Sequence, residues 1–307
     1  MQKIPKETSI RANHRQIILI LLLFLVIALV FFQFYKPDSK LVIDAEGRIH
    51  YPAERGAISA TEELLSNDGA YLLYGISYDS NGTKVYGKLW IPNSSGKHAA
   101  ILFLPGAGVT KDAGLDYANM LRGKGIAVLA IDQRGMGETA ATGTMSLQDE
   151  FNEFILGREY GSILMVYDAL RAFDYLRQRP DIDGNKIAVA GESMGGRNAI
   201  IAGAIEKRFR IVMGISTGGY GMPLSQNANA TRFLRTFDPE NYIGMIVPRK
   251  TVIIHSTEDG VQPFEIGKRT FERANEPKIF YAVGCKTHGL CQEMFPIITK
   301  EIAEAIG

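Results

Sequence analysis

The chain has 307 residues, of which 34 are Lys or Arg and 33 are Asp or Glu, so its formal net charge is +1. A composition that is 46% hydrophobic and 22% charged excludes a disordered chain, and this length can bury one sizeable core. The near-neutral charge argues against a nucleic-acid partner, which needs a basic surface. Two cysteines exclude a disulfide-rich scaffold and a four-cysteine zinc site.

The N-terminal region joins positive charge to a long apolar run. Residues 1–16 form a basic arm, and residues 17–35 are apolar except for Gln33. A helix over 17–35 would reach roughly 28 Å, close to the thickness of a bilayer core. A cleaved secretory signal is the alternative, but no small residues suited to cleavage follow the run. We expect a single-pass transmembrane signal anchor, with a cytoplasmic N-terminus and the rest of the chain extracytoplasmic by the positive-inside rule.

The next segment leads from this anchor into the body of the chain. Residues 36–69 are predicted to be a tether and lead-in, with short helical potential around residues 59–65. The dipeptide Asn81-Gly82 then lies between two strand-like runs, and both residues tolerate the positive φ of a tight hairpin turn. We therefore expect the main domain, over residues 70–307, to open with an antiparallel pair.

From residue 98 onward, buried strands alternate with helical patterns. The predicted strands cover residues 99–104, 127–131, 187–190, 211–215, 251–255 and 278–283. The predicted helices cover residues 115–124, 163–178, 195–205, 264–274 and 295–306. This alternation predicts a mostly parallel sheet with helices on both faces, whose ligands bind at the carboxyl ends of the strands.

One predicted strand ends in a G-x-S-x-G pattern within residues 191–196, directly before an Ala-rich helix. Neighbouring side chains must be absent in such a tight turn, which explains Gly191 and Gly195, and the turn lifts the Ser193 hydroxyl toward the ligand crevice. This setting favours Ser193 as a nucleophile over an ordinary Gly-rich loop. We expect Glu192 to be a solvated or structural acid, because adjacent side chains rarely point together.

With this motif the chain resembles the α/β-hydrolase superfamily, from about Tyr71 to the C-terminus. It is most similar to the dienelactone-hydrolase and prolyl-oligopeptidase-like branch, where an acidic Pro-x-Ile-Asp stretch like residues 180–183 precedes the nucleophile strand. It is also similar to the monoglyceride-lipase and serine-aminopeptidase branch. The resemblance implies an α/β-hydrolase fold.

A serine nucleophile needs a base and an orienting carboxylate. His288 follows the last predicted strand, where the superfamily keeps its base. Asp259 follows the preceding strand in a pattern that resembles the superfamily's G-x-x-D-x-x-x-P, with Glu258 as the second choice and Asp238 as the third. The chain order of Ser193, Asp259 and His288 is that of the superfamily.

The superfamily also implies an oxyanion hole made of backbone N–H groups. By resemblance these come from Ala107 and Met194. Pro105 departs from the His-Gly-x-Gly pattern common at this place, but the donors are backbone groups and do not depend on it. Gly106 and Gly108 allow the backbone to approach a substrate closely.

The two cysteines, Cys285 and Cys291, bracket His288. They could form a disulfide that steadies the loop or remain free thiols, and the spacing favours neither. A metal bound there would occupy the candidate base, so we expect no metal site.

We also expect a short cap over the site around residues 216–250, because a connection this long is usually functional. Residues 140–159 are a candidate second wall. The candidate pocket residues share large apolar side chains and are Phe151, Phe154, Tyr220, Met222 and Phe233.

Together these features predict a membrane-anchored serine hydrolase that needs no cofactor and cleaves a carboxylic ester of a small-molecule acyl substrate through an acyl-enzyme. Ester cleavage is the activity that the resemblance most commonly implies. A peptidase or thioesterase would use the same triad, and a non-catalytic binding module on a hydrolase fold is the alternative of another class.

Overall fold

The computed structural model describes four ranges of the chain, which are residues 17–21, 41–142, 146–221 and 227–307. The chain divides into two units, Met1–Lys40 and Leu41–Gly307. Every strand described below belongs to the second unit.

The expected transmembrane helix over residues 17–35 is contradicted. Across the four described ranges, no helix combines the length and the apolar character that a membrane span requires. Of the expected span, the structure describes residues 17–21, which are helical. The remainder of the expected span, residues 22–35, and the basic arm at 1–16 lie outside the described residues. The membrane partner inferred from that helix therefore has no support here.

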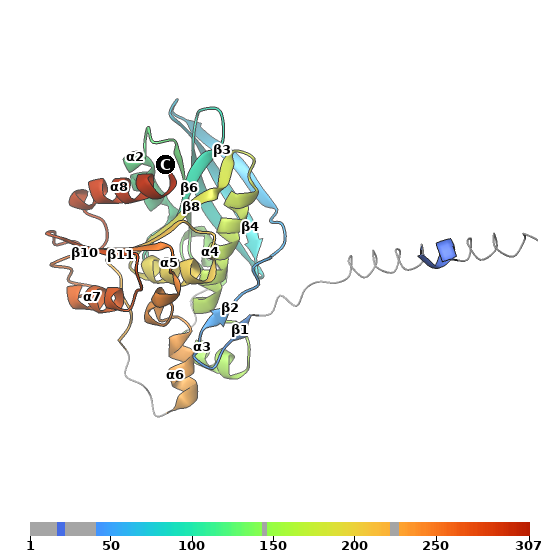
Figure 1. Ribbon diagram of the computed structural model, residues 1–307, viewed down its shortest axis with the longest axis vertical. Helices are drawn as coiled ribbons and strands as arrows, with labels where there is room; N and C mark the ends of the chain where they lie inside the picture. The colour runs from blue at the N-terminus through green and yellow to red at the C-terminus, as the bar shows by residue number, and fades with distance from the viewer. Residues whose placement is uncertain (1–16, 22–40, 143–145, 222–226) are drawn as a thin grey trace, which may run out of the picture. The chain divides into compact units, whose positions relative to one another are not determined.

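A mostly parallel sheet organises the second unit (Figure 1). Within the described residues its strand order is β11-β10-β9-β8-β6-β7-β5-β4-β3. The strands are β3 (Ala60–Asn67), β4 (Tyr71–Ser80), β5 (Thr83–Pro92), β6 (His98–Leu104), β7 (Ile126–Ile131), β8 (Ile182–Glu192), β9 (Ile211–Ile215), β10 (Lys250–Ser256) and β11 (Lys278–Val283). Neighbouring strands from β7 to β11 run parallel, whereas β5, β4 and β3 join antiparallel. This confirms the predicted sheet.

Helices cover both faces of the sheet, as the sequence predicts. They are α2 (Gly114–Met120), α3 (Leu147–Ile155), α4 (Gly161–Gln178), α5 (Met194–Ile205), α6 (Ala228–Arg235), α7 (Phe264–Glu272) and α8 (Phe295–Ile306), with short 3-10 helices at Lys111–Ala113, Gly137–Thr142, Pro239–Asn241, Ile243–Met245 and Gln292–Met294. Leu102 packs in the core formed with α4 and α5, and Ile101 packs in the core formed with α2 and α8. Because β6 is buried on both faces, its sequence is apolar throughout after His98.

The lead-in to the sheet differs from the expected tether. Two short strands, β1 (Val42–Ile43) and β2 (Ile49–His50), pair with each other. The segment expected to be helical around residues 59–65 lies in β3 instead, because β3 pairs antiparallel with β4 and this pairing satisfies its backbone groups. The predicted hairpin is confirmed, since β4 and β5 pair around a turn in which Asn81 and Gly82 both have positive φ.

A buried ion pair ties the hairpin to α4. The guanidinium of Arg134 donates to both carboxylate oxygens of Asp168, at 3.0 and 2.8 Å. It also donates to the hydroxyl of Thr83 and to the carbonyl of Ser80. Both charged side chains are almost completely buried. The turn that carries Arg134 therefore has a structural role.

Replacing Asp168 with Asn should destabilise the fold by about 3–5 kcal/mol, because the buried Arg134 would lose its counter-charge. Urea unfolding at neutral pH measures the change. The matched control is Asp79→Asn, which removes an exposed carboxylate from the same hairpin and should change the free energy of unfolding by less than about 0.5 kcal/mol. Equal effects of the two variants would contradict the structural role of the pair.

Candidate active site

The turn between β8 and α5 holds Ser193 in a strained backbone conformation. Its φ is 52° and its ψ is −117°, a region that costs a non-glycine residue about 1–3 kcal/mol. The two flanking glycines are needed for steric reasons. A Cβ at Gly191 would lie 2.3 Å from the Gly195 carbonyl oxygen, and a Cβ at Gly195 would lie 2.0 Å from the carbonyl oxygen of Leu104. The predicted turn thus requires the predicted glycines.

A carboxylate and an imidazole meet beyond the ends of β10 and β11. The Nδ1 of His288 lies 2.9 and 3.1 Å from the two carboxylate oxygens of Asp259. The Asp259 side chain is fully buried, and that of His288 is 24% exposed. With Nδ1 held as the donor to the carboxylate, Nε2 is the ring nitrogen that can accept a proton.

The Asp259 carboxylate is held in its ionised form. Burial alone would raise its pKa, but hydrogen bonds from the backbone N–H of Gln262 (2.8 Å), from His288 and from the N–H of Val261 (2.9 Å) outweigh burial and lower the pKa below its ordinary value. A negative charge next to Nδ1 stabilises the imidazolium that forms when His288 takes a proton.

The loop that carries His288 lies against the nucleophile turn. The hydroxyl of Ser216 donates to the Gly289 carbonyl at 3.3 Å, and a Cβ at Gly289 would lie 2.9 Å from Oε2 of Glu192. The neighbours of His288 and Ser193 in the sequence are therefore in contact. No hydrogen bond joins the Ser193 hydroxyl to His288 in the described part of the chain. Hydrogen bonds of this kind commonly reach catalytic length only when substrate binds.

The turn after β6 supplies candidate oxyanion donors beside Ser193. A Cβ at Gly106 would lie 3.5 Å from the Cβ of Ser193, so this turn and the nucleophile are neighbours. The backbone N–H groups of Ala107 and Met194 donate to no other group among the residues that the structure describes. Two free donors beside a nucleophile are suited to stabilise negative charge on a carbonyl oxygen.

A hydrogen-bond network that sequence reasoning missed connects these parts. The amide of Gln133 donates to the carbonyl of Pro105 and accepts from the side chain of Asn198. Arg197, which precedes Asn198 in α5, donates to the side-chain oxygen of Gln262 at 2.8 Å. The nucleophile helix is thus joined both to the oxyanion turn and to the Asp259 turn. The polar residues directly after the nucleophile motif were the only sequence signal for this network.

Glu192 is a half-buried acid in contact with the His288 loop, so of the two expected roles the contacts favour the structural one. One carboxylate oxygen, Oε1, is buried and has no hydrogen-bond partner among the described residues. Burial and, to a lesser extent, the negative charge of Asp116 raise the pKa of Glu192 to about 7, although a hydrogen bond from the Leu290 N–H partly opposes the shift. At neutral pH this carboxyl group is close to half protonated.

Glu192→Gln should therefore change the pH dependence of stability. The pKa of Glu192 is higher in the folded protein than in the unfolded chain, so the folded protein binds this proton more tightly. The resulting stabilisation is complete below about pH 4.5 and is lost as the pH rises through about 7. Relative to wild type, the variant should gain up to about 3 kcal/mol between pH 4.5 and pH 8. Urea unfolding at both pH values measures this gain. An equal gain in Glu63→Gln, which neutralises an exposed carboxylate, would contradict the argument.

The alternative acids lie elsewhere. Glu258 is exposed and pairs with Lys286 at 3.3 Å, and Asp238 accepts a hydrogen bond from the N–H of Glu240 at the start of a 3-10 helix. Neither carboxylate bonds to His288 within the described ranges. Of the three candidate acids, Asp259 has the contact that an orienting carboxylate needs.

The two cysteines are joined in a disulfide, with a Cα–Cα distance of 6.7 Å. Of the two possibilities that the sequence left open for Cys285 and Cys291, the structure has the disulfide. The bond closes the seven-residue segment 285–291 that carries His288. The candidate base is therefore held on a short covalent loop.

The candidate pocket residues are only partly brought together. Phe151, Phe154 and Phe233 pack with ring centroids 5.4–6.3 Å apart, so α3 and α6 meet through an aromatic cluster of the core. Tyr220 is 38% exposed and stacks under the guanidinium of Arg197. Met222 lies outside the described residues. The cap expected around residues 216–250 stays a prediction.

Comparison with known proteins gives one family match and one curated relative of note. Residues 66–216 match the acetyl xylan esterase (AXE1) family. An uncharacterized protein of Salmonella typhi, YfhR, is 23% identical over 263 residues, which cover 80% of this chain and 76% of that protein.

Two solved structures are similar in fold over 82% of this chain. Acetyl xylan esterase 1 from Thermoanaerobacterium sp. JW/SL YS485 superposes with a TM-score of 0.68 at 16% identity over 89% of its length. An acetyl xylan esterase from Paenibacillus sp. R4 superposes with a TM-score of 0.70 at 18% identity over 90% of its length. At these identities the similarity establishes the fold.

Proposed function

This chain belongs to the α/β-hydrolase superfamily, and we propose that it is a serine esterase that removes short acyl groups, acetyl above all, from small-molecule esters. The observation that carries the proposal is the position of Ser193. The strained turn at Ser193 lies beside the free N–H of Ala107. Glu192, the residue before Ser193, contacts the loop that carries His288. The matched family and its solved relatives support carboxylic-ester hydrolysis.

The first half-reaction forms an acyl-enzyme. The Ser193 oxygen attacks the ester carbonyl carbon while Nε2 of His288 accepts the hydroxyl proton. The carbonyl oxygen becomes negatively charged and accepts hydrogen bonds from the N–H groups of Ala107 and Met194. The tetrahedral intermediate then collapses, the bond to the alcohol oxygen breaks, and His288 protonates the departing alcohol.

The second half-reaction restores the serine. A water molecule attacks the acyl carbon and gives its proton to His288, and the Ser193 oxygen then leaves and takes that proton back. Asp259 remains ionised throughout and stabilises the imidazolium in both halves. The products are a carboxylic acid and an alcohol.

The acetyl preference rests on the family match, because the matched family and both structural relatives take their names from acetyl esters. Hydrolysis of p-nitrophenyl acetate, butyrate and octanoate tests it, with acetylthiocholine and alanine p-nitroanilide covering thioester and amide substrates. We expect kcat/KM to fall about tenfold or more from acetate to octanoate. Faster cleavage of octanoate or of the amide would contradict the short-acyl esterase.

Covalent labelling tests the nucleophile separately from the substrate. A fluorophosphonate probe should phosphonylate Ser193 in folded protein, and peptide mass spectrometry locates the added mass. Ser95→Ala, which alters an exposed loop serine, is the matched control and should be labelled as wild type is. Folded wild-type protein that remains unlabelled would favour the non-catalytic binding module.

A further inference from the structure

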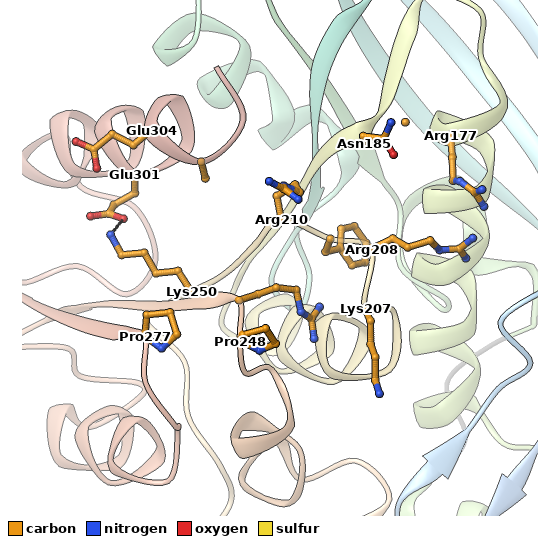
Figure 2. Close-up of a pocket in the computed structure, with 14 residues that line it drawn as sticks. Arg177, Asn185, Lys207, Arg208, Arg210, Pro248, Lys250, Pro277, Glu301 and Glu304 are labelled. Carbon is orange, nitrogen blue, oxygen red and sulfur yellow. Dashed lines mark hydrogen bonds and ion pairs between the residues drawn. The ribbon is translucent and has the colours of Figure 1, made fainter.

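A cavity of about 650 Å³ is shown in Figure 2. It lies at the ends of the strands opposite to the end that carries Ser193. Apart from three residues of α8, its lining residues precede or begin β8, β9, β10 and β11, whereas the candidate catalytic residues follow the strands. Since β9 has five residues and a strand rises about 3.3 Å per residue, the two sites are on the order of 15 Å apart. The cavity is therefore separate from the candidate active site.

The lining of this cavity is strongly basic, and we call it the basic pocket. Its cationic side chains are Arg177, Lys207, Arg208, Arg210, Arg249 and Lys250. Two carboxylates, those of Glu301 and Glu304, also line it. Residues 41–307 as a whole carry a net charge of −3, so the basic pocket runs against the charge of the unit that contains it.

Two of these cations are already neutralised. Lys250 pairs with Glu301 at the wall formed by α8, as Figure 2 shows, and Arg208 pairs with the carboxylate of Glu206. By contrast, the side chains of Arg177, Lys207 and Arg210 have no ion pair or hydrogen bond within the part of the chain that the structure describes. Three of the six cationic side chains around the cavity thus lack a counter-charge among the described residues.

Arg249 adds a buried donor to this set. Its Nε and Nη1 atoms donate to carbonyl oxygens, including those of Gly203 and Glu206 at the end of α5. Its Nη2 atom is buried and has no partner among the described residues. Burial lowers the pKa of this guanidinium, although the charge of Glu206 opposes the shift. An anion next to Nη2 would satisfy the open donor and restore the pKa.

We propose that the basic pocket binds a small polyanion that carries two or more phosphate groups. Its volume lies in the range of small-molecule sites, about 300–1,000 Å³. Arginine guanidinium groups match phosphate oxygens with paired hydrogen bonds, and several unpaired cations around one cavity suit a ligand with several charges. The inference does not rest on the proposed esterase activity, because none of these side chains belongs to the candidate active site.

Isothermal titration calorimetry of the full chain with inorganic pyrophosphate tests the proposal, with citrate as a carboxylate comparison at the same ionic strength. We expect micromolar binding of pyrophosphate, at least about tenfold tighter than that of citrate. The variant K207Q/R210Q should weaken pyrophosphate binding at least about tenfold, because it removes two unpaired cations. Arg235→Gln, which removes an exposed arginine outside the pocket, should bind within twofold of wild type.

Three results would overturn the proposal. One is wild-type protein that gives no binding heat at millimolar pyrophosphate, and another is equal binding by wild type and K207Q/R210Q. The third is co-sedimentation with phosphatidylglycerol vesicles that depends on Lys207 and Arg210 while pyrophosphate fails to bind, since this would assign the patch to a lipid surface. Both substituted residues are exposed, so circular dichroism should show a folded variant.

Discussion

Ser193→Ala should lower kcat for p-nitrophenyl acetate by about five to six orders of magnitude, because no other group can form the acyl-enzyme. The residual rate should come from the Ala107 and Met194 donors and from substrate binding, which together are worth about 10³–10⁴ over water. Steady-state kinetics measures the loss, and active-site titration must exclude wild-type contamination. KM should change little by comparison.

Two controls make this result specific. Ser95→Ala should keep wild-type kinetics, and the urea midpoint of Ser193→Ala should be no lower than that of wild type, because alanine at this site removes no hydrogen bond of the serine hydroxyl in the described residues. A Ser193→Ala enzyme with more than about a tenth of wild-type kcat would disprove the nucleophile assignment.

The second large effect is expected at the carboxylate. Asp259→Asn should lower kcat by about 10⁴-fold near neutral pH, because an amide can hold the wrong imidazole tautomer and cannot stabilise the imidazolium. Its neighbour provides a matched control, since Glu258→Gln neutralises an exposed carboxylate one position away and should retain at least about half of wild-type kcat. Stopped assays over a pH series measure both variants.

The pH dependence of stability gives an independent readout for Asp259. The pKa of Asp259 is lower in the folded protein than in the unfolded chain. Its carboxylate therefore stabilises the folded protein at any pH above the pKa of the unfolded chain, and this stabilisation is lost as the pH falls through the pKa of the folded protein. Wild type should therefore lose stability relative to Asp259→Asn as the pH falls below about 4. A kinetic loss in Glu258→Gln equal to that in Asp259→Asn would move the orienting role away from Asp259.

Prediction of the fold from the sequence succeeded where the local residue pattern and the burial of the segment indicate the same structure. The parallel strands are buried on both faces, so residues 99–104 of β6 and all of β9 are uninterrupted apolar runs. The turn at Ser193 was predictable because its glycines are dictated by local clashes, the same ones that the structure shows at Gly191 and Gly195. The antiparallel hairpin followed from two residues that tolerate positive φ.

Prediction failed where distant parts of the chain decide the outcome. Residues 59–65 have some helical potential, yet the backbone pairing of β3 with β4 outweighs it. The burial of Glu192 depends on α2 and on the His288 loop, neither of which is near it in the sequence. The link from Gln133 to Asn198 joins residues 65 positions apart, so no local pattern indicates it.

The antiparallel end of the sheet has a consequence for solubility. β3 is the last strand on that side, so half of its backbone groups could pair with a strand of another molecule. Its register shifts between Leu64 and Ser66, and the exposed Glu62 and Glu63 precede that irregularity. Such a kink next to the exposed carboxylate of Glu63 discourages an incoming strand. The fold can therefore leave this strand uncovered with little tendency to form intermolecular sheets.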